Sequence, residues 1–338
     1  LFTYAPGKKS MVNRLISYVT FNALATMAGV FSRSRWDVIL CPNGSFFSGL
    51  TAWLVGKAKG IPFIYNVQDL YPDVPIRAGQ LRNRHAIAAL KAIEKFMYRK
   101  ADHITVIAPS FRDNLLSKGV PAEKISIIPN FVDTEFIRPL PKANSFAQQH
   151  GLSDKFVIAH AGNLGYVYDL DTMLNAASLL SSQKDILFLI VGNGVAKPAL
   201  EKKAHELKLD NVRFMPFQPR ESLPWLRASS DVQVSLYKNG AANDSFPSKI
   251  YEIMASGRPL LASSDGDSGV ATLVKTAECG LCVKPGETEH LAEAILDLYR
   301  NPALRETMGE HGRRYAEENH SKQVVIDRYH DLLQRICG

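Results

Sequence analysis

Short apolar runs alternate with helical segments along most of this chain. The runs that predict strands are residues 37–41, 63–67, 102–107, 125–128, 156–161, 186–191, 212–215, 232–235, 259–262 and 281–283. The segments that predict helices are residues 10–32, 49–60, 82–100, 110–118, 170–181, 197–207, 221–228, 288–301, 303–316 and 320–336. Such alternation favours parallel sheets joined by right-handed crossovers. The expected fold class is therefore α/β, with doubly wound parallel sheets.

The length of the chain predicts two domains. A single hydrophobic core rarely grows beyond about 250–300 residues, and this chain has 338. Residues 133–149 include Arg138-Pro-Leu-Pro141 and show little periodicity, as expected for a linker. The boundary is predicted near residue 145, with a first domain over 1–145 and a second over 146–319.

Positive charge is concentrated in the first half of the chain. Residues 1–150 contain 19 Lys and Arg against 9 Asp and Glu. No recognised nucleic-acid motif accompanies these residues, so no nucleic-acid partner is expected. The charge suits an anionic membrane surface or a lipid diphosphate, or it serves only solubility. Residues 10–32 are too polar to span a membrane, and they predict either an interfacial helix or one packed on the sheet.

The cysteine content indicates a reducing compartment. Four cysteines are too few for a disulfide scaffold, and Cys279 and Cys282 lack the further ligands of a zinc site. Both are expected to be small core residues. Neither a signal peptide nor a run of 18 apolar residues is visible. These features favour a cytoplasmic protein, peripheral at the inner face of the membrane.

Residues 243–263 predict a loop, a short helix and a buried strand in immediate succession. Pro247 suits the first helical turn, Gly257 the position after the helix, and Pro259 prevents its continuation. Two carboxylates, Asp244 and Glu252, lie in the loop and in the helix. The following apolar residues 260–262 indicate a strand buried on both faces.

This segment has the chemistry of a nucleotide-sugar site. A phosphate at the helix N-terminus would meet free backbone N–H groups and the positive end of the helix dipole. Lys249 adds a cation, and Glu252 can accept hydrogen bonds from neutral hydroxyls. Phosphate next to vicinal hydroxyls describes a nucleotide diphosphate sugar. Helix dipole, amides and Lys249 replace a metal, so no metal and no cofactor are expected.

The same segment resembles the acidic-x7-acidic signature of the family 4 (group 1) retaining glycosyltransferases, which have the GT-B fold. Asp244 is the first acid, and the run from Glu252 to Pro259, Glu-Ile-Met-Ala-Ser-Gly-Arg-Pro, follows the family pattern closely. The run Pro247-Ser-Lys-Ile-Tyr-Glu252 is similar to transferases that build bacterial surface polysaccharides such as O-antigen and capsule, including N-acetylfucosamine-type enzymes.

The resemblance implies an architecture and a reaction. Two Rossmann-like domains face a cleft, the first binding the acceptor and the second the nucleotide sugar, and helix 320–336 crosses back to the first domain. The family normally opens with a strand, a Gly-rich turn and a helix, and nothing before Leu1 supplies them, so the chain is expected to lack the first βαβ portion of its first domain. The implied donor is a UDP-linked N-acetyl amino sugar. The implied acceptor is a polyprenyl-diphosphate-linked or other saccharide.

Further site residues follow from the same resemblance. Asp244, Asp69 and Lys249 are the expected catalytic residues, with Asp69 facing the acceptor or the donor sugar. The expected donor-binding residues are Glu252 on the ribose, Ser245, Phe246 and Ser248 in the loop, Gly162, Asn163 and Gly165 in a first turn, Gly192 and Gly194 in a second, and Phe217 beside the base. Glu94 matches a family acid of uncertain role, and it could simply pair with Lys91 or Tyr98.

Three other functions stay open at this point. A nucleotide-sugar 2-epimerase has the same architecture, but it needs acid/base side chains that the sequence does not identify. An inactive sugar-binding homologue is compatible with Asp244 in place of the usual Glu. A dinucleotide-dependent oxidoreductase would need Gly-x-Gly-x-x-Gly directly after a first strand, and no segment fits well. Tight turns and helix caps also explain several of the residues above without any ligand.

Overall fold

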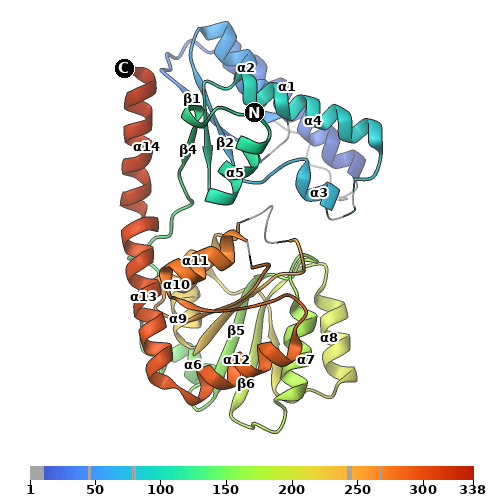
Figure 1. Cartoon of the computed structure of the whole chain (residues 1–338), viewed down its shortest axis with the longest axis vertical. Helices are drawn as coiled ribbons and strands as arrows, with labels where there is room; N and C mark the ends of the chain where they lie inside the picture. The colour runs from blue at the N-terminus through green and yellow to red at the C-terminus, as the bar shows by residue number, and fades with distance from the viewer. Residues whose placement is uncertain (1–10, 45–46, 78, 80, 242–245, 267) are drawn as a thin grey trace. The chain divides into compact units, whose positions relative to one another are not determined.

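A computed structural model of the chain describes residues 11–44, 47–77, 79, 81–241, 246–266 and 268–338 (Figure 1). The chain divides into two compact units. The first includes the described residues up to Pro129, Phe246 and Ile326–Gly338, and the second includes the described residues from Asn130 to Ala241 and Pro247–Val325. Within the described residues, no helix is both long and apolar enough to cross a membrane.

The first unit is built on a parallel sheet with the order β1-β2-β3-β4. Its strands are β1 (Ile39–Pro42), β2 (Phe63–Val67), β3 (His103–Val106) and β4 (Ile125–Ile127). Its helices are α1 (Met11–Phe31), α2 (Ser48–Lys59), α3 (Asp73–Arg77), α4 (Arg84–Lys100), α5 (Pro109–Ser117) and, in large part, α14 (Lys322–Cys337), with the 3-10 turn Ala122–Lys124. All five residues of β2 are buried, as its apolar sequence predicts.

The last helix of the chain, α14, contributes residues 326–337 to this first unit. The Asn66 amide Nδ2 at the end of β2 donates to the Tyr329 hydroxyl at 2.5 Å, and Leu332 is fully buried. Figure 1 shows α14 beside the sheet of this unit. The last turns of the chain therefore belong to the core of the unit with which the chain begins.

The second unit holds a larger parallel sheet with the order β10-β9-β8-β5-β6-β7. Its strands are β5 (Phe156–Asn163), β6 (Ile186–Asn193), β7 (Val212–Met215), β8 (Val232–Leu236), β9 (Leu260–Ser263) and β10 (Gly280–Val283). Its helices are α6 (Ser145–Gln149), α7 (Leu170–Leu179), α8 (Lys197–Glu206), α9 (Leu223–Ala228), α10 (Lys249–Ala255), α11 (Gly269–Ala277), α12 (Thr288–Arg300) and α13 (Pro302–His320), with the 3-10 turn Arg220–Ser222.

Helices cover both faces of this second sheet (Figure 1). Alternate residues of β5 and β6 face opposite ways, as the strand period requires. Ile158 and Phe188 pack with α7 and α12, whereas Val157 and Leu187 pack with α6 and α9. Burial on both faces explains why these strands read as continuous apolar runs in the sequence.

The strand order of the second sheet locates its ligand-binding edge. The first strand in the sequence, β5, pairs with β6 on one side and β8 on the other, so the chain winds outward in both directions from this point. In doubly wound sheets, ligands bind outside the carboxyl ends of the strands at such a switch point. The turn after β5 and the segment between β8 and α10 are therefore the places to look for a site.

Four sequence-based expectations need correction. The division lies after Pro129 and not near residue 145, because Arg313 of α13 donates to the carbonyls of Thr134 and Ile137 and holds the expected linker in the second unit. Helix α10 begins at Lys249, so Pro247 precedes it. Cys279 is buried, but Cys282 is exposed. The short helices α3, α6 and α11 were not predicted.

Candidate functional site

Two glycine turns lie side by side where β5 and β6 end. Gly162 pairs with Gly192 across the sheet, and both have positive φ angles, 145° and 147°. A Cβ on Gly192 would lie 1.8 Å from the Gly162 carbonyl oxygen, and one on Gly194 would lie 2.4 Å from the Leu164 carbonyl oxygen. Close backbone approach therefore explains Gly192 and Gly194, and the positive φ angle favours glycine at position 162.

Lys249, the first residue of α10, lies against the first of these turns. Its Cδ is 3.8 Å from the point where a Gly162 Cβ would stand. Its Nζ lies 4.0 Å from the centre of the Tyr168 ring and has no hydrogen-bond partner among the described residues. Tyr168 is held in turn by its own N–H, which donates to the Gly165 carbonyl at 3.2 Å. The Tyr168 ring thus stabilises the Lys249 cation in place of a carboxylate.

The environment of Lys249 makes its charge depend on pH near neutrality. Burial, and then the nearby Arg227 cation, lower the pKa of Lys249 to about 7, although Glu252 acts in the opposite direction. Burial, followed by Lys249, lowers the pKa of His160 on β5 well below its usual range, so the imidazole is neutral. A dianionic ligand at this edge would supply the partner that the ammonium lacks.

Glu252, one turn further along α10, is held by a buried arginine. The Arg227 Nη2 donates to Glu252 Oε2, and its Nη1 donates to the Gln233 amide oxygen at 2.5 Å. The Arg227 side chain is 3% exposed, whereas that of Glu252 is 38% exposed. The carboxylate is therefore fixed from the protein side and open on the other, as a hydroxyl-binding group requires.

Arg227 is the functional residue that the sequence analysis missed. It lies in α9, whose sequence Leu-Pro-Trp-Leu-Arg-Ala is otherwise apolar, directly before the buried strand β8. A buried charge normally has a charged or hydrogen-bonded partner. An arginine in a short apolar helix was therefore the available signal, but the sequence does not identify Glu252 as its partner.

The remaining predicted residues differ in what the structure shows. Ser248 is exposed and caps α10 without a side-chain hydrogen bond. Phe217 follows β7 with 60% of its surface exposed, so it is not a core residue. Phe246 is grouped with the first unit, where Asp69 also lies, exposed, after β2. Asp244 and Ser245 lie outside the described residues.

Apart from Phe246, the donor-side residues that the structure describes lie at one edge of the second unit. Gly162, Asn163 and Gly165 follow β5, Gly192 and Gly194 follow β6, and Lys249 and Glu252 follow β8 on α10. The described residues contain no group of three or more His, Cys, Asp or Glu arranged to hold a metal ion. Lys249 supplies a buried cation at this edge that a phosphate could meet.

Comparison with known proteins identifies the chain through both of its units. The family model described as "Glycosyl transferases group 1" matches residues 142–315, and that described as "Glycosyl transferase 4-like domain" matches residues 5–130. The "Putative colanic acid biosynthesis glycosyl transferase WcaI" of Escherichia coli is 27% identical over 96% of this chain and 81% of its own length. The alpha-D-kanosaminyltransferase of Streptomyces kanamyceticus is 23% identical over 87% and 76%.

Solved structures agree on the fold. The crystal structure of Anabaena Alr3699/HepE in complex with UDP-glucose gives a TM-score of 0.78 at 18% identity, covering 99% of this chain and 85% of that chain. A sucrose-phosphate synthase from Thermosynechococcus elongatus gives 0.76 at 21% identity, covering 98% and 80%. Together with the two parallel-sheet units, these likenesses confirm the predicted GT-B fold.

Proposed function

The chain belongs to the glycosyl transferases group 1 family and is a glycosyltransferase, and on this premise we propose which reaction it catalyses. It transfers a sugar from a UDP-linked N-acetyl amino sugar to a polyprenyl-diphosphate-linked or other saccharide acceptor, with retention of anomeric configuration. The product enters cell-surface polysaccharide. The name of the Escherichia coli relative, which refers to colanic acid biosynthesis, supports this assignment.

One observation carries the donor assignment: a buried ammonium without a hydrogen-bond partner, at the switch point of the second sheet. The Lys249 side chain lies next to Gly162, whose backbone has no Cβ to keep a ligand away. A diphosphate bound there satisfies the ammonium and meets the backbone of the turn closely. Glu252, oriented by Arg227, lies one helical turn further on and accepts hydrogen bonds from the ribose hydroxyls.

The proposed chemistry breaks the bond between the anomeric carbon and the diphosphate oxygen. The acceptor hydroxyl oxygen forms the new bond on the face from which the diphosphate leaves, and its proton passes to the departing phosphate. Lys249 stabilises the charge that develops on the leaving group, which is the largest contribution that a fixed cation makes. Asp244 holds a hydroxyl of the donor sugar, and Asp69 orients the acceptor hydroxyl. No metal ion takes part.

The basic first half of the chain suits an acceptor that lies at a membrane. A polyprenyl diphosphate and an anionic lipid surface both attract its excess of Lys and Arg. We therefore place the protein in the cytoplasm, in peripheral contact with the inner face of the membrane.

A donor panel tests the proposal. The protein is incubated with UDP-linked sugars and a membrane lipid extract, and the mass shift of the lipid product identifies the sugar transferred. NMR of the product's anomeric proton reads the configuration. Glu252→Ala, which removes the ribose carboxylate, is expected to raise the KM for the donor. Transfer at the wild-type level by this variant would refute the ribose assignment, and inversion of configuration would refute the mechanism.

A further inference from the structure

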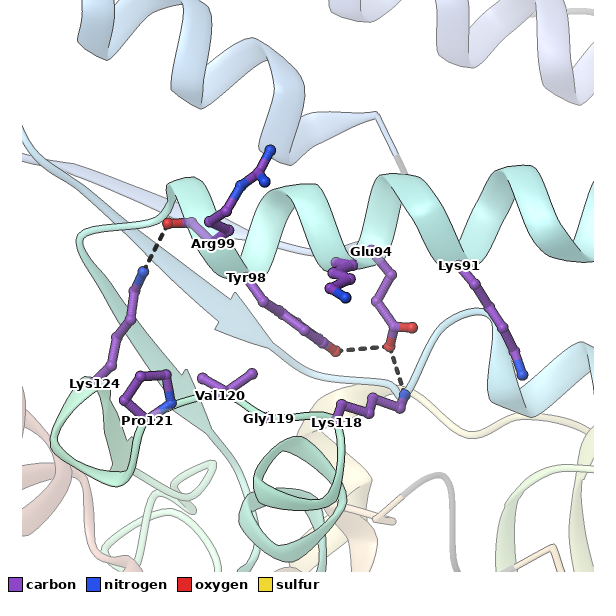
Figure 2. A pocket seen from close by; sticks show the side chains of 10 residues that line it. Lys91, Glu94, Tyr98, Arg99, Lys118, Gly119, Val120, Pro121 and Lys124 are labelled. Carbon is purple, nitrogen blue, oxygen red and sulfur yellow. Dashed lines mark hydrogen bonds and ion pairs between the residues drawn. The ribbon is translucent and has the colours of Figure 1, made fainter.

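A pocket of about 560 Å³ lies in the first unit, between α4 and the loop that joins α5 to β4 (Figure 2). Its volume is within the range of about 300–1,000 Å³ typical of small-molecule sites. The loop residues that line it precede the first residue of β4, whereas doubly wound domains bind their substrates beyond the carboxyl ends of the strands. The pocket therefore lies at the other edge of this sheet, and the proposed reaction assigns no role to it.

One wall of the pocket is a single face of α4. Lys91, Glu94, Lys95 and Tyr98 recur at intervals of three and four residues, so they share one side of the helix. Figure 2 shows the side chains of Glu94 and Tyr98 pointing from the helix toward Lys118 on the opposite loop. This loop supplies the second wall.

A hydrogen-bonded network fixes the two walls to each other. Glu94 Oε1 accepts from the Tyr98 hydroxyl at 3.0 Å and from Lys118 Nζ at 2.6 Å, which confirms the Tyr98 pairing considered from the sequence. Lys118 also donates to Asp73 on α3 at 2.7 Å. On the far side, Lys124 Nζ donates to the Arg99 carbonyl at 3.0 Å. The pocket is thus preformed, which lowers the entropy cost of binding.

The charge that remains in the pocket is positive. Glu94 is the one acid among the residues that line it, and Lys118 already neutralises it. Lys91 and Lys95 have no hydrogen-bond or ion-pair partner among the described residues. Lys124 lies at the far end of the pocket, where its Nζ donates to the Arg99 carbonyl (Figure 2). Lys91 and Lys95 are therefore available to a phosphate group.

The rest of the lining is apolar. Val120 is buried, Pro121 is exposed at the rim, and the Tyr98 ring is buried between them and the helix. Lysine side chains also present their methylene stems to such a surface. A purely inorganic anion would leave this part of the pocket unused.

We propose that the pocket binds a small phosphorylated amphiphile, a phosphate or diphosphate joined to a short apolar group. The phosphate contacts Lys91 and Lys95, and the apolar group packs on Val120, Pro121 and the Tyr98 ring. The site is separate from the donor site in the second unit. It gives the first unit a ligand of its own.

Calorimetric titration of the whole protein with geranyl diphosphate tests the proposal. Saturating UDP is present throughout, so that the diphosphate does not occupy the site at Lys249. Saturable binding is expected, about tenfold tighter than that of inorganic pyrophosphate or of geraniol. Equal affinity for pyrophosphate, or no saturable binding of geranyl diphosphate, would overturn the proposal.

Paired charge reversals locate the binding. Lys91→Glu with Lys95→Glu is expected to weaken binding of geranyl diphosphate about tenfold. Arg33→Glu with Arg35→Glu changes the net charge of the same unit equally, at exposed positions outside the pocket, and leaves binding unchanged. If both pairs weaken binding equally, general charge is responsible and the site is wrong. Circular dichroism checks the fold of each variant, and Lys91→Gln with Lys95→Gln replaces the first pair if that pair misfolds.

Two further measurements separate binding by the apolar lining of the pocket from binding of the lysines to a membrane surface. Pro121→Ser is expected to weaken binding of geranyl diphosphate and to leave that of pyrophosphate unchanged, a pattern that loss of fold would not give. Vesicles of phosphatidylglycerol and phosphatidylcholine provide the alternative source of phosphate. If the Lys91 and Lys95 reversals affect vesicle binding only, the lysines form a membrane patch and the pocket proposal fails.

Discussion

Donor binding should depend on pH through Lys249. In the free protein the pKa of Lys249 is about 7, because its ammonium is buried next to Arg227. A diphosphate bound at this ammonium restores the charged form and returns the pKa toward its ordinary value of about 10.4. Below about pH 7 the lysine is already charged, so binding takes up no proton. Above it, binding must protonate the lysine, and the affinity falls as the pH rises.

The expected size of this effect follows from the lowered pKa. With a free pKa of about 7, the Kd for a UDP-sugar should rise about 30-fold between about pH 6 and about pH 8.5, or about 2 kcal/mol. The groups that face Lys249 do not mask the change. The His160 imidazole stays neutral because burial holds its pKa low, and burial raises the pKa of the Tyr168 hydroxyl.

Calorimetry with UDP-N-acetylglucosamine measures both the affinity and the proton uptake. At about pH 8, titrations in buffers of different ionisation enthalpy should report the uptake of about 0.9 protons. Lys249→Met should bind more weakly at low pH and show no dependence on pH. Lys238→Met removes an exposed lysine after β8 and should keep the full dependence. A flat profile for the wild-type protein, or an unchanged slope for Lys249→Met, would refute the role given to this ammonium.

Three substitutions probe the surroundings of that ammonium. Gly192→Ala places a Cβ 1.8 Å from the Gly162 carbonyl oxygen, and scanning calorimetry should show a loss of roughly 3 kcal/mol in stability. Gly240→Ala, whose Cβ meets open space, should lose less stability. Arg227→Met frees the Glu252 carboxylate. The factor by which the donor KM rises should be about ten times the factor by which kcat falls, and Arg227→Lys should restore part of the donor KM. Tyr168→Phe keeps the cation–π contact and should bind UDP normally, but Tyr168→Leu should bind it a few-fold more weakly; equal binding by both would refute the contact.

Regular elements with strong local signals were predictable from the sequence. β2 and β7 have the predicted bounds, because each is a compact apolar run between turns. The basic helix α4 was predicted from its amphipathic pattern. The missed helices α6 and α11 are short, but each has a cap that sequence reasoning could have used. Asn144 accepts from the Ala147 N–H, and Ser268 accepts from the Ala271 N–H, both at 3.1 Å.

The candidate site was predictable in part, for a similar reason. The glycines and Lys249 lie in segments whose turn and helix signals are local, and the sheet order then brings them to one edge. The partners of these residues depend on contacts distant in sequence. Tyr168 lies under Lys249, and Arg227 bonds Glu252 across helices, and no spacing rule predicts either pair. The sequence analysis therefore named candidate ligating groups but not the residues that hold them.

The participation of α14 in the first unit has a consequence for synthesis on the ribosome. Asn66 finds its partner Tyr329 only after 263 further residues have been translated. The second unit, by contrast, has every residue it needs once Val325 has emerged. The half that starts first is thus the last to be completed, and until then the flank of its sheet on which Leu332 later packs stays uncovered and open to chaperones.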